Sequence, residues 1–141
     1  MKRLFVFFLV FLLFGAALGF SQTMVNSERL RCTFAYNSER NTEILGISHA
    51  VLSSFSDGSL EMVFHYNARS IFAGSPFSIN LRTPGRRSEG FMEYLNVTSD
   101  GFGLAGLNLK AEIYDNVSGT GFSINIDRHD GRNILIFALE R

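Results

Sequence analysis

The chain has 141 residues with 13 basic and 13 acidic side chains, so its formal net charge at pH 7 is zero. This length suits one domain with one hydrophobic core, and the balanced charge argues against a general affinity for nucleic acid or anionic lipid. A single cysteine excludes an internal disulfide, so stability must come from packing.

Residues 1–22, "MKRLFVFFLVFLLFGAALGFSQ", have the layout of a secretory signal peptide. Two cations precede an unbroken apolar run, and small residues follow it. We expect cleavage after Gly19 or Ser21, which leaves one all-β domain over residues 23–141 in a periplasmic or secreted location. A membrane-spanning helix would need about 20 apolar residues, so we expect no stable membrane anchor after cleavage.

The mature chain is slightly acidic, because the leader removes Lys2 and Arg3 and leaves 11 basic residues against 13 acidic ones. Its cysteine, Cys32, lies in "RLRCTFAY" in register with Leu30 and Phe34. That register predicts a buried thiol that behaves as a small hydrophobic side chain and not as a nucleophile.

Beyond the leader, apolar and polar residues alternate with a period of two. Leu60, Met62 and Phe64 alternate with Glu61 and His65, for example, and this period is typical of β-strands with one apolar face. The expected strands cover residues 29–36, 43–55, 60–67, 77–83, 91–98, 104–115, 121–128 and 133–140.

Turn residues separate these runs. Asp57-Gly58, Asp100-Gly101 and Asp130-Gly131 fit type I′ hairpins, in which Asp tolerates a positive φ and Gly adopts it freely. Pro84-Gly85 in "TPGRR" fits a type II turn. About eight antiparallel strands joined mainly by tight hairpins predict an up-and-down barrel or a two-sheet sandwich, and we slightly favour the barrel.

Two motifs suggest a metal or cofactor, and both have simpler interpretations. His129 and Asp130 lie in the last turn, where adjacent side chains diverge, so we predict a turn and no metal site. Residues 101–106, "GFGLAG", match the dinucleotide fingerprint in letters, but a strand pattern follows where the fingerprint needs a helix. We interpret Gly103 and Gly106 as a bulge or bend in a strand and predict no cofactor.

Enzyme activity is not predicted, because no nucleophile, base and orienting group can be assembled from the sequence. His65 and Glu61 share the polar face of one strand and could form an acid/base pair if a pocket covered them. His49 is in phase with Ile47 and Val51, which predicts a place on the core face. An enzyme whose site is assembled across strands remains an alternative.

The interior of an eight-stranded barrel is filled by side chains or holds one small ligand. A filled core and an open cavity give the same sequence pattern. If a cavity is present, it would take a small apolar or amphipathic ligand, and tyrosine hydroxyls could bind its polar part. The alternation points six aromatic candidates inward: Phe34, Tyr36, Phe64, Tyr66, Phe77 and Phe122.

One short segment has an excess of positive charge. Arg82, Arg86 and Arg87 surround "TPGRR", and guanidinium groups suit a carboxylate, phosphate or sulfate, or an acidic protein partner. Asn96 and Asn116 begin glycosylation acceptor sequences, which matter only in a eukaryotic secretory pathway.

A small outer-membrane barrel is a further alternative, since lipid-facing apolar residues and a polar lumen give the same alternation. Most expected strands are shorter than the roughly 9 to 11 residues that cross a membrane, and tight turns are expected on both rims. The sequence therefore favours an exported, non-enzymatic binding or interaction module. In the outer-membrane alternative, the lumen network would contain Arg31, Arg82, Lys110, Glu112 and Asp127.

Overall fold

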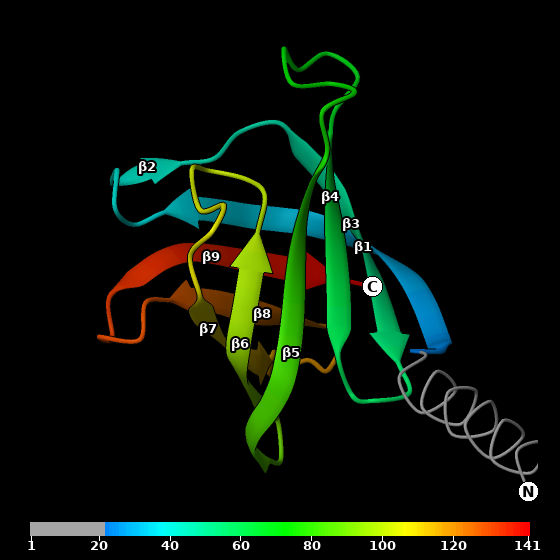
Figure 1. Ribbon diagram of the computed structural model, residues 1–141. Coiled ribbons are helices and arrows are strands. Elements are labelled where there is room, and N and C mark those ends of the chain that lie inside the picture. The colour runs from blue at the N-terminus through cyan, green and yellow to red at the C-terminus, as the bar shows by residue number, and fades with distance from the viewer. Residues whose placement is uncertain (1–21) are drawn as a thin grey trace, which may run out of the picture.

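The structure is a computed structural model that describes residues 22–141, so the expected signal peptide lies outside the described residues except for Gln22. The described chain contains nine β-strands and pairs them all antiparallel (Figure 1). Their bounds are β1 Met24–Asn37, β2 Thr42–Glu43, β3 Ile47–Phe55, β4 Leu60–Tyr66, β5 Phe77–Ser88, β6 Phe91–Ser99, β7 Leu109–Asp115, β8 Gly121–Asp127 and β9 Asn133–Glu140.

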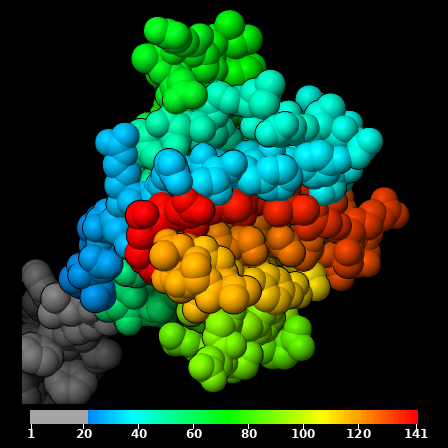
Figure 2. Space-filling view, turned by 180° about the vertical axis from the view of Figure 1, so that it is seen from behind, coloured from blue at the N-terminus to red at the C-terminus, as the bar shows by residue number. Residues whose placement is uncertain are grey.

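The sheet closes on itself as an up-and-down barrel. Apart from the short β2, each strand pairs with the next one along the chain, and β1 also pairs with β9. β1 serves two neighbours because residues 24–31 pair with β3 and residues 31–37 pair with β9. Figure 2 shows β9, in red, lying beside β1, in blue. The predicted all-β fold is confirmed, with eight strands in the closed barrel.

The barrel interior is apolar and filled by side chains. Within β4, Met62 and Phe64 are fully buried, whereas Glu61, Val63 and His65 on the other face are partly exposed. The same alternation continues around the barrel, as expected for strands that bury one face. The largest fully buried side chains include Tyr94, Phe64, Phe137, Leu30, Met62, Ile79, Leu81, Leu109, Ile124, Ile126, Ile134 and Leu135.

This arrangement is the reverse of the one that the outer-membrane alternative needs. Arg31 and Arg82 are exposed, and Lys110 and Glu112 alternate with the buried core residues of β7, so these four side chains lie on the outer face. Asp127 is buried and accepts a hydrogen bond from Asn133 Nδ2 at 2.9 Å. Strand length does not decide between an outer-membrane barrel and a barrel outside the membrane, because β1 has 14 residues and β5 has 12.

The two ends of the barrel differ. Three connections, residues 56–59, 89–90 and 116–120, form what we call the closed rim. At the opposite end, the connections 38–46, 67–76, 100–108 and 128–132 form the open rim. Three of these four are longer than any connection at the closed rim, and Figure 2 shows the green 67–76 loop projecting from the barrel.

Two of the predicted Asp-Gly turns join neighbouring strands, but they are not the predicted type I′ turns, because Gly58 and Gly131 have a positive φ (84° and 89°) and Asp57 and Asp130 do not. Asp57 shapes the first, because its Oδ1 accepts bonds from Ser59 N (3.0 Å) and Ser59 Oγ (2.6 Å), and its Oδ2 from Gln22 Nε2 (2.6 Å). These bonds lower the pKa of Asp57 to about 2. In the second, Gly131 N–H donates to Arg128 O at 2.9 Å.

Asp100-Gly101 is not a tight hairpin, and this prediction was wrong. β7 begins at Leu109 and not at residue 104, so residues 100–108 form a loop. Gly103 and Gly106 have φ of 70° and 82° and belong to turns in this loop, not to a bend in a strand. Leu104 closes one of these turns and is 2 % exposed, which anchors the loop in the barrel.

The turn predicted at Pro84-Gly85 was also wrong. Both residues lie within β5, and the chain reverses only at residues 89–90. The register between β5 and β6 shifts between Pro84 and Arg87, which is a bulge in the strand. A Cβ atom at Gly85 would lie 2.5 Å from Glu93 Oε1, so a larger residue here would have to displace the Glu93 carboxylate.

Candidate functional site

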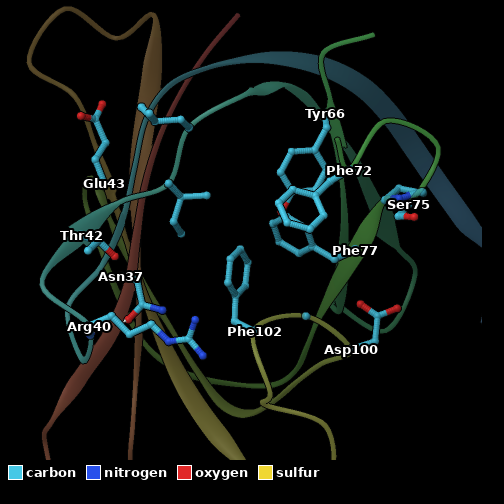
Figure 3. Close-up of a pocket in the computed structure, with 14 residues that line it drawn as sticks. Asn37, Arg40, Thr42, Glu43, Tyr66, Phe72, Ser75, Phe77, Asp100 and Phe102 are labelled. Atoms are coloured by element: carbon cyan, nitrogen blue, oxygen red, sulfur yellow. Dashed lines mark hydrogen bonds between the residues drawn. The ribbon is translucent and has the colours of Figure 1, made fainter. Parts of the chain in front are cut away.

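A pocket of about 710 Å³ lies at the open rim, where the 38–46, 67–76 and 100–108 loops surround the end of the barrel (Figure 3). We call it the mouth pocket. Its volume is within the range of roughly 300–1,000 Å³ that is usual for small-molecule sites. Its walls differ in chemistry, with aromatic side chains on one side and, on the other, polar ones followed by Ile44 and Leu45.

Four side chains form the aromatic wall, two from strands and two from loops: Tyr66, Phe77, Phe72 and Phe102. Tyr66 ends β4, and its ring centroid lies 5.3 Å from that of Phe72 and 5.9 Å from that of Phe77. Phe102 meets the Phe77 ring edge-on at 4.9 Å. Phe72 is 53 % exposed, so a large apolar surface faces solvent at the pocket.

The aromatic side chains of the mouth pocket rest on the barrel core. Phe77 is 6 % exposed and stacks on the fully buried Phe64 at 4.8 Å, and Phe64 packs against Phe137 at 4.4 Å. These contacts fix Phe77 in place because a close-packed interior leaves its ring little room to move. The core therefore fixes the Phe77 end of the aromatic wall, and the Phe72 end faces solvent.

The polar wall consists of Asn37, Arg40, Thr42 and Glu43, which lie at the end of β1, in the following turn and in β2. Arg40 N–H donates to Asn37 Oδ1 at 3.0 Å, which is the local bond that turns the chain after β1. β2 then pairs with the same end of β1 through Tyr36 and Asn37. Figure 3 shows these four residues opposite the aromatic wall.

Backbone bonds tie the loops of the open rim together. Ser78 N–H donates to Asp100 Oδ1 at 2.7 Å, which attaches the start of the 100–108 loop to β5. Asn67 N–H donates to Gly46 O at 2.7 Å and joins the loops on either side of β3 and β4. Phe102 has a φ of 56°, an uncommon value for a bulky residue, and its ring packs on Phe77.

The six aromatic candidates are distributed over four places. Tyr66 and Phe77 line the mouth pocket, and burial raises the pKa of the Tyr66 hydroxyl. Phe64 lies beneath the pocket in the core. Phe122 is buried at the start of β8, which is the closed-rim end of the barrel.

Phe34 and Tyr36 do not point into the barrel as expected. A bulge between Cys32 and Phe34 shifts the register with β9, so that Ala35 and Asn37 become the inward residues of β1. Phe34 is 42 % exposed and stacks on Tyr36 on the outer face, with 6.0 Å between the ring centroids.

Of the three arginines predicted as an anion or partner site, one is already paired within the fold. Arg86 forms an ion pair with Glu93 at 3.2 Å, and its backbone N–H also donates to Glu93 Oε1 at 3.2 Å. These bonds lower the pKa of Glu93 and raise that of Arg86. Arg82 and Arg87 are exposed and have no ion pair within residues 22–141.

The histidine predictions are partly corrected. His49 is not on the core face, because Ala50 is the inward residue there and His49 stacks on His65 at 4.8 Å on the outer face. Burial, with Arg29 and His65 nearby, lowers the pKa of His49. His49 also lines a groove of about 540 Å³ on the outer face, in which Arg31 is neutralised by Glu140 at 2.6 Å.

No group of three or more His, Cys, Asp or Glu side chains in residues 22–141 is arranged to hold a metal ion. The fingerprint-like segment 101–106 leads into β7, so a helix N-terminus does not follow it. Within the same residues, no helix is long and apolar enough to cross a membrane.

The sequence interpretation missed most residues of the mouth pocket, Asn37, Arg40, Phe72 and Phe102 among them. These four lie at strand ends or in loops, where a period of two carries no information. One signal could have found them. In an up-and-down barrel alternate connections share a rim, so the predicted connections 37–42, 68–76 and 99–103 would have met at one end.

The described part of the chain is thus a small closed β-barrel with an aromatic and polar pocket at its open rim. Comparison of the sequence with family models and curated proteins, and comparison with solved structures, finds no match.

Proposed function

We propose that the protein is an exported, non-enzymatic binding module that holds one small amphipathic molecule in its mouth pocket. The mouth pocket itself is the observation that carries this proposal. The barrel interior is filled, so the space available for a ligand lies above Phe77 and not at the barrel centre.

The two walls favour an amphipathic ligand over a purely polar or purely apolar one. The exposed ring of Phe72 and the partly exposed rings of Tyr66 and Phe102 would gain from covering by an apolar group. Across the pocket, Asn37, Arg40 and Glu43 offer groups that orient a polar end.

Export and the absence of catalysis are parts of the proposal with separate support. The leader-like sequence of residues 1–22 supports export. A binding role is favoured because the His65 and Glu61 pair, the best acid/base candidate in the sequence, lies on the outer face of β4 and does not line the mouth pocket.

The first test is binding of N-phenyl-1-naphthylamine, a neutral apolar fluorophore. Phe72→Ala should weaken its affinity about tenfold, a loss of about 1.4 kcal/mol, because one face of the pocket is removed. The urea midpoint should change little, since Phe72 is already half exposed.

Phe34→Ala is the matched control, because it removes an equally exposed ring from the outer face away from the pocket. It should leave the affinity unchanged. Absence of binding to the wild-type protein, or equal losses in the two variants, would contradict the proposed function.

A further inference from the structure

We propose that the ligand of the mouth pocket is an anionic amphiphile, whose acidic group binds between the guanidinium of Arg40 and the side-chain amide of Asn37. This inference rests on the proposed function and names the chemical class of the ligand. It follows from three features of the polar wall.

The first feature is the free guanidinium of Arg40. Figure 3 shows this side chain extending from the polar wall into the pocket toward Phe102. It makes no side-chain hydrogen bond or ion pair with any residue of the described chain, 22–141. Its neighbours on the open rim differ, since Arg128 is paired with Glu39 at 2.8 Å and Arg132 with Asp130 at 3.2 Å.

The second feature is the amide of Asn37, a residue that is only 6 % exposed. Its Oδ1 accepts from the backbone N–H of Arg40 at 3.0 Å, and its Nδ2 still offers two donors. No residue of the described chain, 22–141, accepts a hydrogen bond from Nδ2. Every fully buried side-chain nitrogen or oxygen in those residues has a partner, so Nδ2 must be accessible, and it faces the pocket that Asn37 lines.

A carboxylate or sulfonate suits this pair of donors. A guanidinium presents its N–H groups in a planar fork that matches two acceptor oxygens, and bonds with a charged partner are about twice as strong as neutral ones. An acidic group between Arg40 and Asn37 would leave the apolar part of the ligand directed at Phe102 and the rest of the aromatic wall.

The third feature is the position of the acidic residues that also line the pocket. Asp100 is engaged by the Ser78 N–H at 2.7 Å. Glu43 lies on β2, and Figure 3 shows its carboxylate pointing away from Arg40 and from Phe102. Of the two charged side chains on the polar wall, Arg40 is therefore the one that points toward Phe102.

Two probes with one ring system test the inference. N-phenyl-1-naphthylamine is neutral, and 8-anilinonaphthalene-1-sulfonate adds an anionic group to the same skeleton. The full-length gene is expressed, the exported protein is purified without detergent, and both affinities are measured by fluorescence titration. The wild-type protein should bind the sulfonate more tightly than the neutral probe.

Arg40→Gln should weaken binding of the sulfonate about tenfold and leave the neutral probe unchanged, because one charge-assisted interaction is lost. The matched control is Arg69→Gln, which removes the same charge from an exposed position in the 67–76 loop outside the pocket lining. It should leave both affinities unchanged. Asn37→Asp, which keeps an acceptor for Arg40 N–H and removes the donors, should also weaken only the sulfonate.

The outcomes separate this inference from the proposed function. Equal affinity for the two probes, or equal effects of Arg40→Gln and Arg69→Gln on the sulfonate, would overturn the anionic class while a binding pocket remains. If neither probe binds the wild-type protein, both the proposed function and this inference fail.

Discussion

At the residue scale, Glu93 neutralises one arginine of the β5–β6 hairpin, Arg86. Its carboxylate lies against Gly85 and accepts from both the backbone and the side chain of Arg86. The guanidinium of Arg86 also lies 5.6 Å from the centre of the Phe91 ring. The sequence predicted a cationic loop, but the nearest carboxylate in space, seven residues along the chain, neutralises one of its charges.

Glu93→Gln should make stability less dependent on pH. A carboxylate with a lowered pKa in the folded state stabilises the fold above its unfolded pKa, and this contribution is lost as pH falls through the folded value. The urea midpoint of the variant should therefore lie below that of wild type near pH 7 and approach it below about pH 4.5.

Glu89→Gln is the control, since Glu89 is exposed in the turn of the same hairpin. Its difference from wild type should stay small at both pH values. A Glu93→Gln difference that is constant, or that grows on acidification, would show that the ion pair with Arg86 does not stabilise the fold.

Cys32 should be an unreactive thiol in the folded protein. Burial raises its pKa to about 11, so the thiolate is rare at neutral pH. At pH 8 alkylation by iodoacetamide should be about a hundredfold slower in buffer than in urea, on the thiolate fraction alone. Mass spectrometry follows the reaction without ambiguity, because the chain has one cysteine. Equal rates would mean that the β1 bulge exposes the thiol.

At the element scale, the sequence predicted strands better than their irregularities. All eight barrel strands were predicted, and β4, β6, β8 and β9 were placed within one residue at each end, because each strand buries one face and shows it as alternation. The bulge before Phe34 was invisible, since one extra residue reverses the inward face without changing the composition. Pro84-Gly85 was wrongly predicted to form a turn because Pro and Gly are also found at bulges within strands.

The mouth pocket was less predictable than the barrel. Tyr66 and Phe77 were found because they lie in strands, whereas Arg40, Phe72 and Phe102 lie in turns and loops of irregular backbone. Which loop residues face one another depends on the closed barrel and on bonds such as Asn67 N–H to Gly46 O. Such bonds join backbone groups, which are the same in nearly every residue, so the sequence does not reveal them.

The open-rim loops should exchange amide hydrogens rapidly and slow down when a ligand binds. Most residues of 38–46 and 67–76 are exposed, and β2 contributes only Thr42 and Glu43 to the sheet. With N-phenyl-1-naphthylamine bound, peptides from these loops and from 100–108 should gain protection in hydrogen exchange measured by mass spectrometry.

The 56–59 turn at the closed rim is the internal reference and should exchange equally with and without the probe. Protection that appears there, or that spreads evenly over the barrel, would place the ligand elsewhere or indicate a general change in stability.

At the scale of the whole molecule, the packed core and the mouth pocket occupy different parts of the barrel. Apolar side chains such as Phe64 and Phe137 fill its interior, while the polar outer face carries Arg31, Lys110 and Glu112. The fold therefore provides a rigid base, and the open-rim loops provide the pocket above it. The packed interior follows from strand alternation, which the sequence contains. The pocket also requires barrel closure, which the sequence only suggests.

The measurement that tests the proposed binding site most directly is native mass spectrometry of the protein expressed from the full-length gene, purified without detergent and then mixed with N-phenyl-1-naphthylamine. We predict a complex with one probe molecule per chain that dissociates on denaturation and is weakened by Phe72→Ala but not by Phe34→Ala. A bare chain under all conditions, or several probe molecules bound equally by both variants, would contradict a binding site at the mouth of the barrel.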